Sequence, residues 1–238
     1  ENPDYVSIAL DAQKPTFRHE IFSNYKANRK KMPDDLRLQI PEITKLISKS
    51  SISLLINEGY EADDIIATVV EKNKKEQLST YIVTGDKDIM QLVNDKTFVY
   101  NPGNKFSGPI IYDKEKVYKK WNVPPDKICD LLSIMGDTSD NIPGVKGVGP
   151  KTASKLINDF GGVDDILRKV DDIQNNRIKE LIKNQVDDIR MATELVQLKN
   201  DVPIEFDIES MDVSNIKFEN IEEDLKKNEM PSLLESSG

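Results

Sequence analysis

The sequence is poor in the residue types from which disulfide frameworks and zinc sites are built. Its 238 residues include one cysteine, Cys129, and one histidine, His19. A single cysteine excludes a disulfide within the chain and a zinc site made of cysteines, and a single histidine excludes a site made of several imidazoles. We therefore expect the chain to work in a reducing compartment, the cytoplasm.

Long apolar runs and a bias toward disorder are also missing. No apolar run approaches the roughly 18–20 residues that a membrane span needs, and no charged-then-apolar signal peptide opens the sequence. Hydrophobic residues make up 37% and charged residues 32% of the sequence, which can fill a core and excludes a disordered or collagen-like chain. The length fits one domain with an appendage or two small domains. Because the first residue is Glu1, we expect the natural N-terminus to lie upstream.

Acidic residues outnumber basic ones. The sequence has 42 Asp and Glu residues against 33 Lys and Arg residues, so its formal net charge is −9. Such a balance ordinarily argues against a nucleic-acid partner. Net charge does not say where the charges lie. Whether the chain can bind nucleic acid therefore depends on the positions of its acids and bases.

Short apolar runs alternate with helix-like segments in the first half of the sequence. Strands are predicted at residues 6–10, 53–56 and 80–83, with an edge hairpin formed by residues 98–100 and 110–112. Helices are predicted to begin near Met32 and Glu61, and the apolar stripe of the first consists of Leu36, Ile40, Ile43 and Ile47. The alternation predicts an α/β fold with a mostly parallel sheet covered on both faces.

The pattern changes near Asn122. Strand signals fade there, and helices are predicted at residues 126–135, 151–160 and 175–198. We therefore predict an α/β domain at residues 1–122, a helical subdomain at residues 123–210 and a C-terminal tail at residues 211–238.

Closely spaced acids occur in three short segments and at the end of one strand. They are Glu61, Asp63 and Asp64 in a first helical turn, Asp86 and Asp88 after a strand, Asp137 and Asp140 after a helix, and Asp11 at the end of the first strand. Sites in open parallel sheets form at the carboxyl ends of the strands. Clustered carboxylates repel one another, and hard divalent cations resolve that conflict. The set predicts an all-carboxylate site for two Mg²⁺ or Mn²⁺ ions, which suits attack of water on a phosphodiester.

Each acidic segment also has a plainer interpretation. Acids in a first helical turn are favoured by the helix dipole and by capping. The Asp86 and Asp88 segment could be an ordinary turn, and Asp137 and Asp140 could be caps or solvated loop residues. The metal interpretation rests on the set taken together.

A basic segment with interleaved aromatics covers residues 14–32. Its bases are Lys14, Arg18, Lys26, Arg29, Lys30 and Lys31, and its aromatics are Phe17, Phe22 and Tyr25. Bases that contact phosphates, together with aromatics that stack on nucleobases, suit a single nucleic-acid strand. An amphipathic surface helix with a solvated charged face explains the segment equally well.

A glycine-rich turn leads into the helix predicted at residues 151–160. Gly144, Gly147 and Gly149 permit close backbone approach and positive φ, and the helix N-terminus that follows can bind phosphate, with Thr152 in its first turn. Lys146, Lys151 and Lys155 add positive charge, and no acid occurs between Ile142 and Asn158. The alternative is a tight interhelical turn, but the coincidence of bases and open N–H groups favours contact with a nucleic-acid backbone.

Several motifs occur together in a characteristic order. They are Asp11 with Thr16-Phe17-Arg18-His19-Glu20, Tyr25-Lys26-Ala27-Asn28-Arg29, Gly59-Tyr60-Glu61-Ala62-Asp63-Asp64, Thr84-Gly85-Asp86-Lys87-Asp88, and Met135-Gly136-Asp137-Thr138-Ser139-Asp140-Asn141-Ile142-Pro143-Gly144-Val145. In order and spacing the sequence resembles the 5′–3′ exonuclease (flap endonuclease-type) domain of bacterial DNA polymerase I. The resemblance covers at least residues 6–198.

The resemblance implies a fold, an activity and roles for particular residues. The fold is a twisted, mostly parallel sheet between helices, PIN/flap-nuclease-like, with a helix–three-turn–helix DNA-binding subdomain. The activity is metal-dependent hydrolysis that releases 5′-phosphorylated products. The resemblance assigns Asp11, Glu61 and Asp63 to the first metal, Asp86, Asp88 and Asp140 to the second, and Asp64 and Asp137 to the same cluster.

The same resemblance assigns residues to DNA and to the reaction. Lys26 engages the scissile phosphate, and Arg18, Tyr25 and Arg29 lie in the segment that guides the 5′ strand. The segment from Gly144 to Lys155 corresponds to the duplex-backbone site, where a K⁺ ion is held by backbone carbonyls in this family. The resemblance also implies a further strand, ending in an Asp-Gly pair, upstream of Asp11.

We therefore expect a structure-specific 5′ nuclease that acts on flaps or nicked DNA in replication and repair. The expected setting is a monomer on cytoplasmic, nucleoid DNA, with a DNA polymerase as partner and no membrane. Two alternatives are a non-catalytic DNA-binding module and an RNA-directed nuclease with the same sheet.

Overall fold

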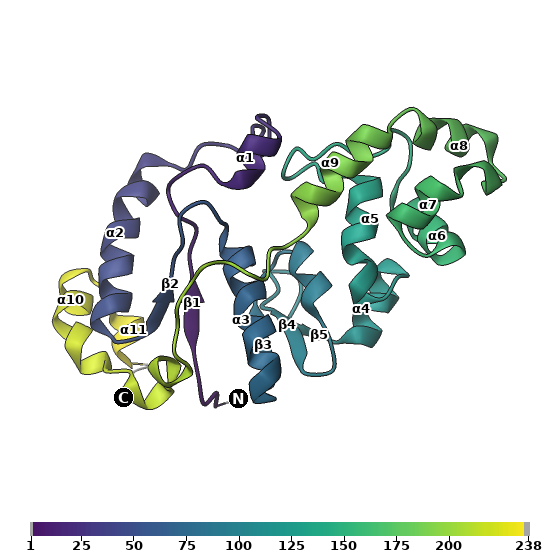
Figure 1. The fold of residues 1–238 in the computed structure, drawn as a ribbon. Helices are drawn as coiled ribbons and strands as arrows, with labels where there is room; N and C mark the ends of the chain where they lie inside the picture. The colour runs from purple at the N-terminus through teal and green to yellow at the C-terminus, as the bar shows by residue number, and fades with distance from the viewer. Residues whose placement is uncertain (1, 236–238) are drawn as a thin grey trace. The chain divides into compact units, whose positions relative to one another are not determined.

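A computed structural model describes residues 2–235 of the chain (Figure 1). The chain forms two compact units, and the segments of each are interleaved along the sequence. One unit contains the residues up to Lys14, Lys30–Ile65 and the residues from Val202 onward; the other contains Pro15–Arg29 and Ile66–Asp201. The sequence analysis divided the chain into contiguous domains with a boundary near Asn122. That boundary stays a prediction. Within the described part of the chain, no helix is both long and apolar enough to cross a membrane.

The first unit contains a small parallel sheet with one long helix. Its elements are β1 (Ser7–Ala9), α2 (Asp34–Lys49), β2 (Ser53–Leu55), the first turn of α3 (Ala62–Glu76), the 3₁₀ helices at Ile208–Met211, Val213–Asn215 and Phe218–Ile221, α10 (Glu222–Lys227) and α11 (Pro231–Glu235). β1 and β2 pair in parallel, with Ile8 opposite Leu54. Thus two of the predicted strands are neighbours, and their carboxyl ends meet at one edge.

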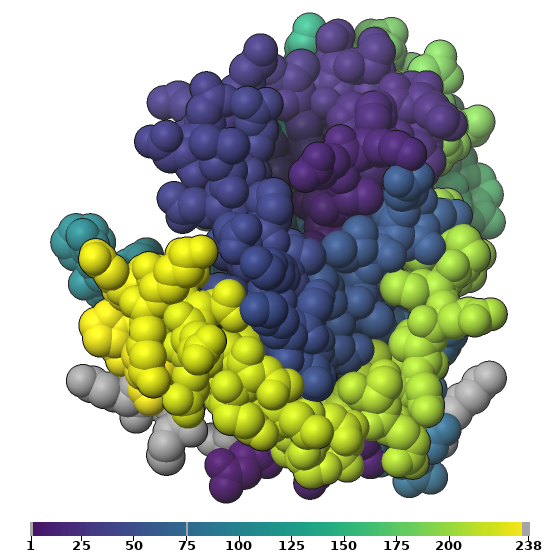
Figure 2. Space-filling model, turned by 90° about the vertical axis from the view of Figure 1, so that its left-hand side faces the viewer, coloured from purple at the N-terminus to yellow at the C-terminus, as the bar shows by residue number. Residues whose placement is uncertain are grey.

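Helix α2 starts where the sequence predicted, but its apolar stripe is not buried. Pro33 precedes the first turn. Asp34 and Asp35 in that turn interact favourably with the positive end of the helix dipole. No residue of α2 is buried, and Leu36 is 42% and Ile43 40% exposed. The stripe stays open because, among the described residues, α2 packs mainly on β2 and the C-terminal segment, where Lys49 binds Asp224 at 2.6 Å. Figure 2 shows the C-terminal segment lying beside α2.

The second unit combines a three-stranded sheet with most of the helices. Its elements are α1 (Phe17–Ile21), the rest of α3, β3 (Thr80–Val83), β4 (Thr97–Asn101), β5 (Ile110–Tyr112), α4 (Lys114–Trp121), α5 (Ile128–Met135), α6 (Pro150–Phe160), α7 (Val163–Arg168), α8 (Asn176–Lys183), α9 (Val186–Val196) and the 3₁₀ helices at Asp88–Leu92, Pro125–Lys127 and Val170–Asp172. β3 and β4 are parallel, and β4 and β5 form the antiparallel edge hairpin that the sequence predicted.

Helix α5 lies at the centre of the second unit's core. Its sequence is almost entirely apolar, which is typical of a helix enclosed on all sides. Leu131, Leu132 and Ile134 are at most 1% exposed, and α5 packs against α6 and α9. The loop that follows α5 therefore leaves from a rigid base.

The structure corrects the sequence analysis at three points. The described strands form two separate sheets and not a single one. The helix predicted at residues 175–198 is two helices, α8 and α9, because the chain breaks at Asn184 and Gln185 and the acids Asp187 and Asp188 start a new helix. Helix α4 was not predicted, although Asp113 caps it by accepting a hydrogen bond from Lys116 N.

Candidate functional site

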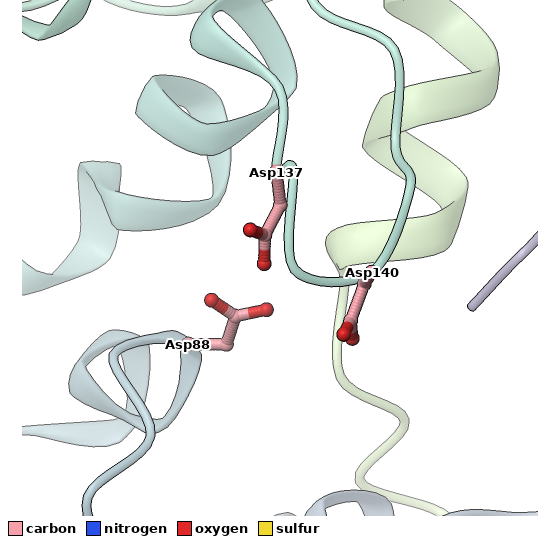
Figure 3. Close-up of side chains that lie close together, drawn as sticks. All are labelled: Asp88, Asp137 and Asp140. Atoms are coloured by element: carbon pink, nitrogen blue, oxygen red, sulfur yellow. The ribbon is translucent and has the colours of Figure 1, made fainter. Parts of the chain in front are cut away.

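Three carboxylates from two segments of the second unit face a common space (Figure 3). Asp88 begins the 3₁₀ helix after β3, and Asp137 and Asp140 lie in the loop after α5. One oxygen of each lies within 4.8 Å of the others. These three acids are called the acid cluster below. All three were among the metal-site candidates of the sequence analysis, and the resemblance assigned them to one cluster.

Two glycines fix the loop that carries Asp137 and Asp140. Gly136 has φ +72°, and a Cβ built on Gly144 would lie 2.3 Å from Gly136 N. The backbones of the two glycines therefore touch, and no side chain fits between them. Asp137 and Ile142 exchange two backbone hydrogen bonds of 2.8 and 3.0 Å across the loop. This contact assigns Gly144, predicted to contact DNA, a packing role in the loop.

Asp86 supports the acid cluster from the β3 side. Its Oδ1 accepts a hydrogen bond of 2.9 Å from Asp88 N, and its own N–H donates to Thr84 Oγ1 at 3.0 Å. These bonds fix the turn after β3 and direct Asp88 toward the loop. Within the described residues, Asp86 is not part of the set whose oxygens lie within 4.8 Å of one another.

Burial dominates the electrostatics of Asp88. Burial, followed by the neighbouring charge of Asp86, raises the pKa of Asp88 to about 7, while the charge of Lys87 acts in the opposite direction. Asp88 Oδ1 is buried without a hydrogen-bond partner among the described residues, and its ion-pair contact with Lys87 Nζ spans 3.6 Å. A buried carboxylate oxygen without a donor is costly, and a cation would satisfy it.

The donor set of the acid cluster fits a hard divalent cation. Its ligand atoms are all carboxylate oxygens, which suit Mg²⁺ and Mn²⁺ better than zinc or copper. Asp137 and Asp140 are 5% and 6% exposed. Three acids held this close in a buried site would repel one another without a counter-charge.

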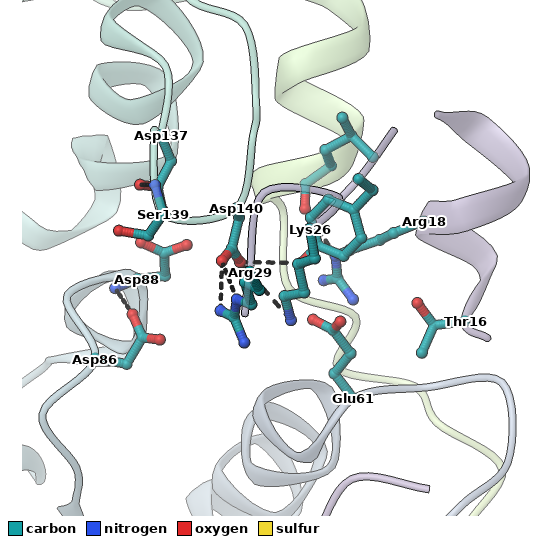
Figure 4. A network of polar contacts seen from close by, with 12 residues as sticks. Thr16, Arg18, Lys26, Arg29, Glu61, Asp86, Asp88, Asp137, Ser139 and Asp140 are labelled. Atoms are coloured by element: carbon teal, nitrogen blue, oxygen red, sulfur yellow. Dashed lines mark hydrogen bonds and ion pairs between the residues drawn. The ribbon is translucent and has the colours of Figure 1, made fainter. Parts of the chain in front are cut away.

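Basic side chains supply part of that counter-charge at Asp140 (Figure 4). Arg29 donates from Nε to Asp140 Oδ1 at 3.0 Å and forms a second bond to the same oxygen through its Nη2. Lys26 Nζ lies 3.7 Å from Asp140 Oδ2, and Tyr25 donates its hydroxyl to that oxygen at 3.2 Å. The basic segment thus reaches the acid cluster. The catalytic roles that the sequence predicts for Lys26 and Arg29 stay predictions.

Two asparagines, unassigned by the sequence analysis, join the basic segment to the loop. Asn28 donates its side-chain amide to Thr138 O, and Asn141 donates to Asn24 O at 2.7 Å. Lys26 N donates to Asp140 O at 2.8 Å. Both asparagines lie inside the motifs, but only a structure shows that they bind backbone carbonyls of each other's segment.

The side chain of Arg18 is engaged inside the protein, and its predicted DNA contact stays a prediction. Arg18 is 1% exposed, and its Nε donates to Leu195 O at 2.7 Å. A second guanidinium nitrogen lies 3.3 Å from Gln197 O, so Arg18 binds the carbonyls at the C-terminal end of α9. Tyr25 is also buried, at 4% exposure, and its ring is not available for base stacking in this conformation.

The remaining acids lie together at the start of α3 in the first unit. Asp11 Oδ1 accepts a hydrogen bond of 2.7 Å from Ala62 N, and Asp64 Oδ2 accepts one of 3.0 Å from Glu61 N. Glu61 is 8% and Asp64 0% exposed, and Asp63 is half-buried. The capping interpretation is therefore correct for Asp64, and Asp11, for which the sequence analysis gave no capping role, also accepts from the first turn of α3. The metal role of the four acids stays a prediction.

The glycine-rich turn ends in an open helix N-terminus. Gly149 precedes α6 without any side-chain cap, and a Cβ added there would meet nothing within 4 Å. Lys146, Lys151 and Lys155 are exposed. Arg177 of α8 was missed by the sequence analysis, and its Nη2 lies 3.3 Å from the Cβ position of Gly147, which has φ +84°. Four bases therefore lie in or beside the turn that leads to the N-terminus of α6.

Cys129 is no candidate nucleophile. It is half-buried against the core of the second unit. Burial raises the pKa of the Cys129 thiol to about 11, and the charge of Asp130 contributes to this. This agrees with the sequence interpretation of Cys129 as a small packing residue.

Known families match nearly the whole chain. Residues 1–122 match the model of the 5′–3′ exonuclease N-terminal resolvase-like domain, and residues 123–219 match that of the 5′–3′ exonuclease C-terminal SAM fold. The chain therefore belongs to the 5′–3′ exonuclease family of metal-dependent nucleases.

Relatives and solved structures agree with this assignment. A 5′–3′ exonuclease of Aquifex aeolicus is 37% identical over 98% of this chain and 78% of its own length. DNA polymerase I of Bacillus subtilis is 37% identical over the whole chain but only 27% of its own length. A T5 5′-exonuclease solved with divalent metal ions (zinc) is 25% identical, with a TM-score of 0.67 over 80% of this chain and 72% of that one. The chain thus spans about a quarter of the polymerase, and its relationship is to the exonuclease part.

Proposed function

We propose that this nuclease hydrolyses DNA phosphodiesters near 5′ ends, at flaps and nicks, with two bound Mg²⁺ or Mn²⁺ ions. The observation that carries the proposal is the acid cluster, in which a buried Asp88 oxygen lacks a hydrogen-bond donor. Lys26 and Arg29 lie beside it. A site that combines a buried carboxylate oxygen lacking a donor with adjacent cations suits an anionic substrate held at a metal centre.

Each unit would hold one ion. One ion would be bound by the acid cluster, with Asp86 holding Asp88 in position. The second ion would be bound by the other acids, which are Asp11, Glu61, Asp63 and Asp64. Bound divalent ions supply a water of lowered pKa as nucleophile and stabilise charge on the leaving oxygen. The division follows the two places in the chain where acids gather.

The chain's own bases position the substrate. Lys26 and Arg29 would neutralise the oxygens of the scissile phosphate, which carry the developing negative charge. Their present partner is Asp140, so both groups already lie within reach of the acid cluster.

The glycine-rich turn would bind the duplex backbone. Open N–H groups at the start of α6 contact a phosphate, and Lys146, Lys151, Thr152 and Lys155 add charge and hydrogen-bond donors. Backbone carbonyls around Gly147 and Gly149 would hold a K⁺ ion. Contacts of this kind recognise the shape of the duplex and not its sequence.

The polymerase I relatives suggest the biological setting. We propose a monomer that removes flaps or primers during replication and repair, on nucleoid DNA in the cytoplasm, beside a DNA polymerase. The polymerase could belong to the same natural polypeptide, as it does in the Bacillus relative, or be a separate chain.

A cleavage assay on a labelled 5′ flap tests the proposal. The full chain should cut the flap with Mg²⁺ or Mn²⁺ and stop when EDTA is added. Asp88→Asn should lower the rate by more than about a hundredfold, because even the outer-shell partners of a metal contribute about 10- to 100-fold. The matched control is Asp95→Asn, since Asp95 is exposed and pairs with Lys114 away from the acid cluster.

The outcomes separate the alternatives. Binding of the flap without cleavage under either metal would favour the non-catalytic DNA-binding module. Equal cleavage of an RNA flap would favour the RNA-directed nuclease. Full activity of Asp88→Asn would contradict the assignment of the acid cluster as the metal site.

A further inference from the structure

One lysine lies inside the acid cluster itself. Lys87, between Asp86 and Asp88 in the sequence, donates from Nζ to Asp137 Oδ2 at 2.7 Å and lies 3.6 Å from Asp88 Oδ1. Its side chain is 26% exposed and that of Asp137 5%. Lys87 thus joins the two segments that form the cluster.

The ammonium competes for oxygens that a cation would use. Asp137 Oδ1 accepts a hydrogen bond from Ser139 N at 2.9 Å, and Asp137 Oδ2 accepts the bond from Lys87. The other oxygen near Lys87 is Asp88 Oδ1, which has no hydrogen-bond donor among the described residues. A divalent cation at this place must share Asp137 Oδ2 with the ammonium or displace it.

Lys87 is a different counter-charge from those at Asp140. Arg29 and Lys26 come from the basic segment and bind Asp140, whereas Lys87 binds Asp137 and approaches Asp88. A lysine has no geometric preference beyond its charge and three donors. It can therefore hold the two carboxylates in place without a metal and move aside when one binds.

We propose that Lys87 is a positioning residue that holds Asp88 and Asp137 together and sets how tightly the acid cluster binds a divalent cation. The inference rests on the proposed function, since it takes the cluster to be a metal site. Ligand charge count tunes cation affinity over orders of magnitude. A positive charge 2.7 Å from one ligand oxygen lowers the affinity of the whole site.

Manganese binding measures the effect directly. Free Mn²⁺ has a strong paramagnetic resonance signal that is lost on binding, so titration of the full chain gives the affinity without any turnover. Lys87→Met should bind Mn²⁺ about tenfold more tightly, because the competing charge is gone. Lys87→Arg should stay close to the natural protein, since the charge is retained.

A matched lysine supplies the control. Lys114 pairs with Asp95 at 2.7 Å, the same separation as Lys87 and Asp137, but on an exposed surface. Lys114→Met should leave Mn²⁺ affinity unchanged. Unchanged or weaker affinity in Lys87→Met, with Lys87→Arg and Lys114→Met normal, would overturn the proposal.

A double variant ties the effect to the cluster. In an Asp137→Asn background, Lys87→Met should raise Mn²⁺ affinity much less, because the carboxylate that Lys87 binds at 2.7 Å is neutral and only the longer contact with Asp88 remains. An equal gain in that background would overturn the inference. If the natural protein binds no Mn²⁺ and Asp137→Asn changes nothing, both the proposed function and this inference fail; if Asp137→Asn weakens binding but Lys87→Met does not strengthen it, the inference alone fails.

Thermal unfolding gives a second reading. Without metal, Lys87→Met should melt at a lower temperature than the natural protein, since three close acids lose a counter-charge. Saturating Mn²⁺ should restore most of the difference. A loss of stability that Mn²⁺ does not restore would mean that Lys87 has only a structural role, and would overturn the proposal.

Discussion

At the scale of single residues, Asp88 is the side chain whose surroundings oppose its charge most clearly. Its carboxylate is buried beside Asp86, Asp137 and Asp140, and these surroundings raise its pKa to about 7. The ordinary pKa of an aspartate side chain is 3.8. Between these two values the folded chain holds a proton that the unfolded chain has released.

The sign of the pH dependence follows. Since the folded protein binds more protons than the unfolded chain between about pH 4 and pH 7, the stability contributed by Asp88 is complete below pH 4 and is lost as the pH rises through 7. We expect Asp88→Asn, in EDTA, to raise the free energy of unfolding at pH 8 by about 1–3 kcal/mol, with a smaller gain at pH 5. Urea unfolding at both pH values measures this, with Asp95→Asn as control. A gain that is larger at pH 5 than at pH 8 would contradict it.

The acids of the site could be predicted from the sequence. Which of the bases are buried could not. The segments with closely spaced acids could be named as metal-site candidates, and the resemblance grouped Asp88, Asp137 and Asp140 in one cluster. Arg18, in contrast, binds Leu195 O, which lies 177 residues further along the chain. Local spacing carries no information about a partner that far away, so Arg18 read as one more base of an exposed segment.

At the scale of elements, the loop after α5 decides the geometry of the acid cluster. Gly136 and Gly144 touch backbone to backbone, and the loop between them carries Asp137 and Asp140. Any shift of this contact moves both acids. The loop matters more to the site than the length of either neighbouring helix.

A pair of alanine substitutions tests this loop. Gly144→Ala places a Cβ 2.3 Å from Gly136 N, so we expect a loss of about 1–3 kcal/mol in unfolding free energy, of the size found for overpacking. Mn²⁺ affinity and flap cleavage should fall with it. Gly149→Ala, where a Cβ meets nothing within 4 Å, should change stability by less than about 0.5 kcal/mol. Equal stability of the two variants would show that the close contact is not maintained in solution.

The elements themselves were only partly predictable. Strands were found because short β-branched runs stand out between polar turns. The break between α8 and α9 was missed because Asn184 and Gln185 continue a helical pattern. Gln185, between the two helices, also makes a tertiary contact, since its Oε1 accepts a hydrogen bond from Lys146 N in the glycine-rich turn.

At the scale of the whole molecule, the net charge of −9 conceals an uneven distribution. Eight of the 42 acids are the metal-site candidates. Without them the sequence has 34 acids and 33 bases. The remaining surface is close to neutral, and exposed bases gather at the glycine-rich turn. An acidic protein can therefore bind an acidic polymer.

Salt dependence of DNA binding tests that distribution. Each phosphate contact contributes about 0.9 to the slope of log affinity against log salt concentration. Replacing Lys146, Lys151 and Lys155 by alanine should therefore reduce the slope by about 2 to 3, as measured by fluorescence anisotropy on nicked duplex in EDTA. Lys183→Ala is the control, since Lys183 pairs with Asp171. A slope equal to that of the natural protein would mean that the turn does not contact the backbone.

The backbone conformation of Lys26 is unfavourable for stability, whereas its side chain lies beside the acid cluster. Its φ of +57° is a left-handed conformation that costs a side-chain-bearing residue about 1–2 kcal/mol and costs glycine little. Selection for stability alone would therefore place a glycine at this position. A lysine at this position is consistent with a stability–activity trade-off, in which some stability is lost so that an ammonium group lies near Asp140.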